Sequence, residues 1–122
     1  MYERELELAL AMVRDASLLA RSVQQEIVAR DESVTKEDRS PVTVADLAVQ
    51  AVVTRRLAAV FPADPLLAEE DASPLTDPGQ RHVADAVLDL VRRSEPEMGA
   101  DELARTLQRS DLAGAHPRRY WI

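Results

Sequence analysis

The longest periodic segment of the chain covers residues 3–30, and it constrains the fold more than any other feature. Apolar residues recur there at intervals of three and four positions, which is the period of an α-helix. One stripe runs through Leu6, Leu10, Val13, Ser17 and Ala20, and a second runs through Leu8, Met12, Ala16, Leu19, Val23 and Ile27. Two stripes predict a long helix that is covered on two sides.

A second helix is expected after a polar loop over residues 31–39. Ser40–Val42 is predicted to be extended, because the residue before a proline avoids the helical region. Thr43 followed by Asp46 resembles a capping box, which would begin a helix that runs to about Val60. Its inward side is expected to carry Val49, Val52, Val53, Leu57 and Val60.

Shorter elements are predicted for the rest of the chain. Pro65–Ala68 is a strand candidate, and Thr76–Pro78 is expected to open a helix with a buried stripe of Val83, Val87, Leu88 and Val91. A last short helix is expected over about residues 100–109.

The ending Arg118–Ile122 is typical of a strand entering a core. Two isolated strands do not make a stable sheet, so we expect the rest of the sheet beyond Ile122 and interpret residues 1–122 as the N-terminal portion of a single domain.

Composition argues against several kinds of partner. The chain has 15 basic and 22 acidic residues, a formal net charge of −7, which disfavours non-specific nucleic-acid binding. It has no cysteine, which excludes disulfides and thiolate metal sites and favours a cytoplasmic location. No apolar run approaches the roughly 20 residues of a membrane span, and the residues after Met1 do not resemble a signal peptide. Neither a nucleic acid nor a membrane is therefore an expected partner.

Carboxylates are the strongest candidates for chemistry. Glu69, Glu70 and Asp71 are consecutive, and such a group is tolerated in water or around a hard cation such as Mg²⁺, which takes oxygen ligands. Asp46 is the second candidate, because a carboxylate in a first turn can hold a metal-bound water at a cleft. A solvated acidic turn and a helix cap are the structural alternatives. His82 and His116 lack partners at ligand spacing.

Four stretches together resemble the N-terminal part of the 3′(2′),5′-bisphosphate nucleotidases, which are metal-dependent phosphatases of the inositol monophosphatase-like class. Residues 2–20 resemble the family's first helix, and residues 40–46 match its "SPVTVAD" motif. Residues 61–71 are similar to its "FPDDPIVGEED" stretch, and residues 118–122 resemble the strand that leads into its metal box "DPIDGT". The order and approximate spacing agree over essentially the whole chain.

The resemblance implies an α+β fold, in which this segment is the mainly helical N-terminal part of a layered α/β sandwich with one or two short strands. It implies a Mg²⁺ site with Glu69 as a ligand and Glu70 beside it. Asp46 would be the catalytic residue near the metal-bound water, and Lys36 would belong to a mobile loop near the metals. Ala68 departs from the family, which has glycine before the two glutamates.

The complete relatives of this kind remove the 3′-phosphate from adenosine 3′,5′-bisphosphate, a by-product of sulfate activation. The sequence ends where "DPIDGT" should begin, so we expect this chain alone to be inactive and to bind Mg²⁺ weakly at most. The alternative hypothesis is a non-catalytic helical module derived from that family, which self-associates through Tyr120–Ile122. A third hypothesis, an unrelated acidic helical domain, requires accidental motif matches.

Overall fold

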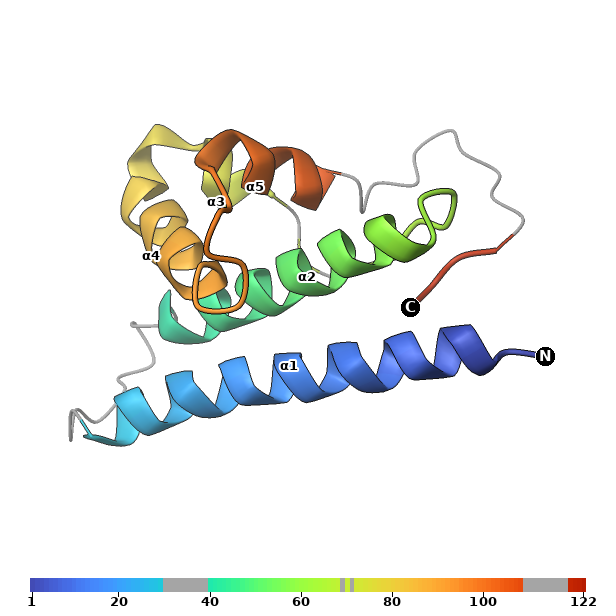
Figure 1. The fold of residues 1–122 in the computed structure, drawn as a ribbon. Helices are drawn as coiled ribbons and strands as arrows, with labels where there is room; N and C mark the ends of the chain where they lie inside the picture. The colour runs from blue at the N-terminus through green and yellow to red at the C-terminus, as the bar shows by residue number, and fades with distance from the viewer. Residues whose placement is uncertain (30–39, 69, 71, 109–118) are drawn as a thin grey trace.

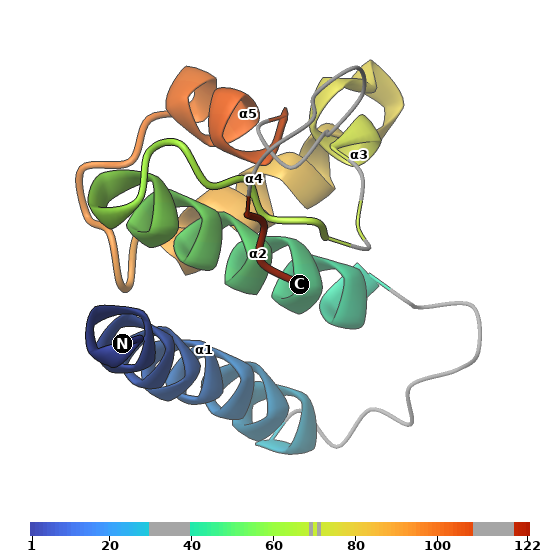
Figure 2. The same ribbon diagram turned by 90° about the vertical axis from the view of Figure 1, so that its right-hand side faces the viewer.

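The computed structural model describes residues 1–29, 40–68, 70, 72–108 and 119–122. Their elements, in chain order, are α1 (Glu3–Ala29), α2 (Ser40–Val60), α3 (Ser73–Thr76), the 3₁₀ turn η1 (Pro78–Gln80), α4 (Arg81–Val91) and α5 (Ala100–Gln108). The long helices α1 and α2 lie side by side in opposite directions (Figure 1). Helices α3, α4 and α5 lie on the other side of α2 (Figure 2). The central helix α2 therefore organises the core.

Only one of the two apolar stripes of α1 is buried. Met12 and Leu19 are buried, with Leu8 and Val23 packed beside them. Leu6, Leu10 and Val13 of the other stripe are exposed. The prediction of a helix covered on two sides is thus wrong for the described residues, because they pack against a single side of α1. None of the described helices combines the length and apolar character needed to cross a membrane.

Helix α2 begins at Ser40, three residues earlier than predicted. The expectation of an extended Ser40–Val42 and of a Thr43 cap is wrong. Proline is compatible with the first turn of a helix, because the N–H that it lacks has no partner there anyway, so Pro41 does not delay the start. The helix ends at Val60, as predicted.

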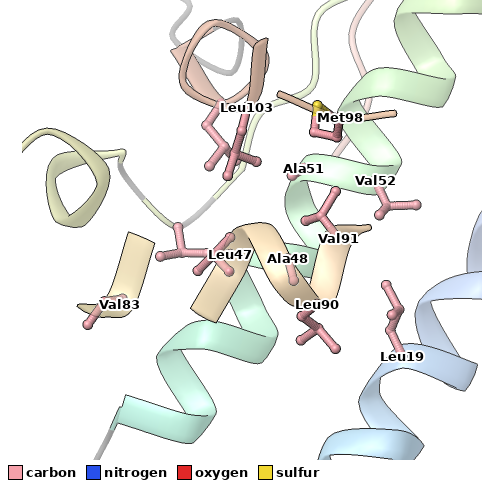
Figure 3. Packing of buried hydrophobic residues seen from close by; sticks show 12 residues of the cluster. Leu19, Leu47, Ala48, Ala51, Val52, Val83, Leu90, Val91, Met98 and Leu103 are labelled. Atoms are coloured by element: carbon pink, nitrogen blue, oxygen red, sulfur yellow. The ribbon is translucent and has the colours of Figure 1, made fainter. Parts of the chain in front are cut away.

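The main core forms where α2 packs against α4 and α5 (Figure 3). Ala48 and Ala51 are fully buried, and their small side chains let the other helices approach α2 closely. The larger buried side chains come from four parts of the chain: Leu19 of α1, Leu47 and Val52 of α2, Val83, Val87, Leu90 and Val91 of α4, and Met98, Leu103 and Leu107 at and after the turn that leads to α5. Burial of each large apolar side chain contributes about 1.5–3 kcal/mol.

The two shorter predicted helices are present as α4 and α5, and α4 begins later than predicted. Asp77 caps the turn at Pro78 by accepting a hydrogen bond from the Gly79 N–H at 2.8 Å, and α4 begins only at Arg81. Its buried side carries Leu90 where Leu88 was expected, and Leu88 is half-buried. Helix α5 matches its predicted range to within one residue.

The predicted strands are absent from the part of the chain that the structure describes. Leu66 and Trp121 instead form a single parallel bridge, in which the Leu67 N–H donates to the Trp121 carbonyl at 2.7 Å and the Trp121 N–H donates to the Pro65 carbonyl at 3.0 Å. The two segments predicted as strands do meet. Two short segments make too few ladder bonds for a sheet, so the fold of the described residues is helical, and the predicted layered sandwich is not seen.

Candidate metal-binding site

Asp46 and Gln50 lie one turn apart on α2, on the same face of the helix, since residues four apart are neighbours. The side chain of Asp46 is exposed, as a residue that meets a metal or substrate must be. Gln50 is only 7% exposed. Solvent exposure on this face of α2 therefore falls within one turn, from the exposed carboxylate of Asp46 to the buried carboxamide of Gln50.

The carboxamide of Gln50 joins α2 to the acidic segment. Its Nε2 donates a hydrogen bond to the main-chain carbonyl of Glu70 at 2.8 Å, and its Oε1 accepts one from the Glu70 N–H at 3.3 Å. Both polar ends of the side chain thus contact the main chain of one residue. This pairing holds the main chain of Glu70 against α2 at Gln50.

The structure places two of the four predicted site residues. Asp46 is exposed on α2, and Glu70 is half-buried with its main chain hydrogen-bonded to Gln50 of the same helix. Glu69 and Lys36 lie outside the described residues, so their predicted roles stay predictions. The carboxylate oxygens of Asp46 and Glu70 are donors of the type that Mg²⁺ takes. No three His, Cys, Asp or Glu side chains gather into a metal-holding group within the described residues.

Ala68 has apolar neighbours at the position where the family has glycine. It packs against the second buried cluster, formed by Met12, Leu57 and Leu66. The methyl group is therefore accommodated beside the acidic segment.

The basic residue nearest the end of the chain is already paired. Arg119 Nε donates to Asp64 Oδ2 at 2.7 Å, and its Nη1 lies 2.6 Å from Glu5 Oε1. These contacts, the hydrogen bond to Asp64 first, raise the pKa of the Arg119 guanidinium above its ordinary value. Arg119 therefore ties the C-terminal segment to α1 and to the turn after α2, instead of offering a free cation to a phosphate.

A shallow groove lies elsewhere, between α2 and α5. Thr54, Arg55 and Ala58 line it from α2, and Glu102, Arg105 and Thr106 line it from α5. Arg55 is occupied by Glu95 and Glu102, at 3.7 and 3.5 Å. The groove contains none of the predicted site residues. His82 is exposed on α4, in agreement with its reading as a surface histidine.

Sequence reasoning missed Gln50. A signal was present, because Gln50 falls among Leu47, Ala48, Ala51 and Val52 on the buried part of α2. A buried carboxamide needs hydrogen-bond partners. The sequence could predict that Gln50 has a partner but could not identify the main chain of Glu70, twenty residues away.

Several known proteins similar to this chain are named as bisphosphate nucleotidases. The chain is 39% identical over 98 residues to 3′(2′),5′-bisphosphate nucleotidase 1 of Candida albicans (strain WO-1), an alignment that covers 79% of this chain and 26% of the relative. It is 30% identical over 131 residues to the 3′(2′),5′-bisphosphate nucleotidase of Schizosaccharomyces pombe, covering 98% and 37%. An Arabidopsis thaliana relative whose name includes "mitochondrial" is 42% identical over 72 residues, covering 58% and 18%.

No family model matches the chain. The chain spans 26% and 37% of the lengths of the Candida and Schizosaccharomyces relatives, whereas the alignments cover most of this chain. The relatives carry the name that the motifs indicated, and the identity extends well beyond those motifs. The chain is homologous to a portion of the 3′(2′),5′-bisphosphate nucleotidases, the family that its sequence resembles.

Proposed function

We propose that this chain is the N-terminal portion of a Mg²⁺-dependent phosphatase that converts adenosine 3′,5′-bisphosphate and water into AMP and phosphate. The observation that carries the proposal is the similarity to proteins of that name along 79–98% of the chain. The main chain of Glu70 is held by Gln50, which lies one turn from Asp46 on α2, and this contact supports the proposal. The proposal extends to sulfur metabolism, because this substrate is a by-product of sulfate activation.

The proposed roles follow from carboxylate chemistry. Glu69 and Glu70 hold Mg²⁺, and Asp46 orients the attacking water. A metal of this kind lowers the pKa of its bound water and stabilises the attacking and leaving oxygens. Water adds to phosphorus, the bond from phosphorus to the 3′-oxygen breaks, and a proton passes to that oxygen. Because Mg²⁺ needs about six oxygen ligands in near-ideal geometry, two or three carboxylates hold it weakly, and we propose that residues 1–122 alone are inactive.

The first test is to sequence the transcript past the codon for Ile122 and to assay the encoded product. Phosphate release from adenosine 3′,5′-bisphosphate with Mg²⁺ is expected from a product that continues into "DPIDGT", and Glu69→Gln is expected to reduce it at least 100-fold, on the order of the loss from removing one transition-state-stabilising group. Asp85→Asn, an exposed carboxylate on α4, is the matched control. A folded, longer product with no more activity than its Glu69→Gln variant would contradict the proposal.

The chain of 122 residues is assayed beside it. Phosphate release well above that of its own Glu69→Gln variant would refute the proposal that residues 1–122 are inactive alone. A genuine stop codon after Ile122 would favour the second candidate function instead.

The second candidate is a non-catalytic module that associates with its own copies. One observation favours it: Tyr120 is exposed and Ile122 is 91% exposed, on either side of the packed Trp121. For location we propose the cytoplasm, with the absence of cysteine as support. The mitochondrial name of one relative makes cell fractionation the direct test.

A further inference from the structure

We propose that Gln50 is a positioning residue, which fixes the main chain of Glu70 on α2 and so sets the spacing between Asp46 and the acidic segment. The inference rests on the proposed function for the metal, and it adds a residue to which the family resemblance gave no role. Its basis is the pair of hydrogen bonds from one carboxamide to one peptide residue, at 2.8 and 3.3 Å.

The geometry of the pair explains why Gln50 can fix a position. A single hydrogen bond leaves its partner free to rotate about the bond. Two bonds, one donated and one accepted, fix both the distance and the orientation of the main chain at Glu70. The longer bond, accepted by Oε1, is the weaker of the two, since N–H···O distances cluster near 2.9–3.0 Å.

The surroundings of Gln50 make this a costly choice for stability alone. Leu47, Ala51 and Thr54, which are neighbours of Gln50 on α2, are buried. A carboxamide at such a depth loses its hydration, and its hydrogen bonds only offset that loss. An apolar side chain of the same length would leave the N–H and the carbonyl of Glu70 without these two partners. The carboxamide is therefore explained by what it holds in place.

The metal gives a reason to hold Glu70 in place. Mg²⁺ requires near-ideal octahedral geometry with oxygens at 2.0–2.1 Å, so a ligand whose main chain drifts is a poor ligand. Some residues do not touch the metal but orient the residues that bind it. Replacing one of them typically lowers the metal affinity 10- to 100-fold. We expect a loss in that range when Gln50 can no longer hold Glu70.

The experiment uses the chain of 122 residues and two variants. Gln50→Met keeps the length of the side chain and removes both of its hydrogen bonds to Glu70. Thr54→Val is the matched control: it lies one turn further along α2, is 3% exposed, and loses a side-chain hydrogen bond to the Gln50 carbonyl at 2.7 Å. Gln50→Asn, which keeps the amide but shortens its reach by one methylene, replaces Gln50→Met should that variant not fold.

The first readout is hydrogen exchange of the Glu70 amide, followed by NMR. Because Gln50 Oε1 accepts from that amide, Gln50→Met is expected to speed its exchange at least 10-fold relative to amides in the middle of α4. Thr54→Val is expected to leave this ratio unchanged even if both variants are equally destabilised. A Glu70 amide that exchanges alike in wild type and Gln50→Met would overturn the proposal.

The second readout is a Mg²⁺ titration, monitored by the NMR shifts of Asp46 and Glu70. Gln50→Met is expected to weaken Mg²⁺ binding at least 10-fold, and Thr54→Val less than 2-fold. Faster Glu70 exchange with unchanged Mg²⁺ affinity would show Gln50 to be only a structural contact, and would also overturn the proposal. If wild type shows no shift at either carboxylate, the metal assignment fails for this chain, and the exchange result decides separately whether Gln50 holds Glu70.

Discussion

At the scale of single residues, the buried side chain of Leu47 tests how much the packing around α2 contributes to stability. Its side chain is 1% exposed and lies in the core shared by α2, α4 and α5. Replacing a buried leucine by alanine removes apolar contacts and leaves a cavity, at a cost of about 2–5 kcal/mol. We predict a loss in that range for Leu47→Ala, measured by urea unfolding followed by circular dichroism.

The matched control for Leu47 is Leu18→Ala. Leu18 is 57% exposed on α1, so the same change of side chain is expected to alter the free energy of unfolding by no more than about 0.5 kcal/mol. If the two variants lost equal stability, the packing of α2 described above would be incorrect.

At the scale of elements, one carboxylate contacts two side chains of the segment from Arg119 to Ile122. Asp64 Oδ2 accepts hydrogen bonds from Arg119 Nε at 2.7 Å and from Trp121 Nε1 at 3.1 Å. Trp121 also lies beside Phe61, with the ring centroids 5.9 Å apart. Asp64→Ala removes the shared acceptor, so we predict that the segment leaves its place while the helices remain.

Fluorescence measures this directly, because Trp121 is the only tryptophan of the chain. The emission maximum of Asp64→Ala is expected to shift to longer wavelength, toward that of an exposed indole, with an unchanged helical circular dichroism signal. Asp85→Ala, which removes an exposed carboxylate from α4, is expected to leave the emission unchanged. An unshifted maximum in Asp64→Ala would show that the packing of Trp121 does not need Asp64.

Helices that are determined by neighbouring residues were predictable from the sequence. Features that depend on contacts between residues far apart in the sequence were not. Apolar periodicity located α1, and the predicted end of α2 at Val60 is confirmed. The start of α2 was misplaced because the sequence before Pro41 favours an extended chain, whereas the structure uses the proline in the first turn.

The sequence predicts a chemistry for the candidate site, which stays a prediction, but it does not predict the contact that the structure shows there. Consecutive carboxylates indicated a cation site, and the motif order indicated the family. The contact between Gln50 and Glu70 crosses twenty residues of sequence, so no local pattern encodes it. The two predicted strands illustrate the same limit, since the pattern identified Leu66 and Trp121 but not that they would meet in a single bridge.

At the scale of the whole molecule, two apolar surfaces lack cover among the described residues. One is the stripe of Leu6, Leu10 and Val13 on α1. The other is the C-terminal segment, where Tyr120 and Ile122 are exposed. Trp121 uses its N–H and C=O toward Pro65 and Leu67. In strand geometry the main-chain groups of its two neighbours turn to the opposite edge, and an open edge of this kind favours pairing with another chain.

We therefore predict that the chain self-associates through its C-terminal segment. Sedimentation equilibrium of the chain of 122 residues is expected to show a mass that rises with concentration, because a second copy can pair with the open edge and cover Tyr120 and Ile122. Replacing Ile122 by aspartate is expected to weaken the association at least 10-fold. Leu10→Lys places a charge on the exposed stripe of α1 instead, and this variant is expected to change the association constant less than 2-fold. Loss of association in Leu10→Lys alone would assign the interface to α1, and a constant monomer mass at all concentrations would remove the case for a self-associating module.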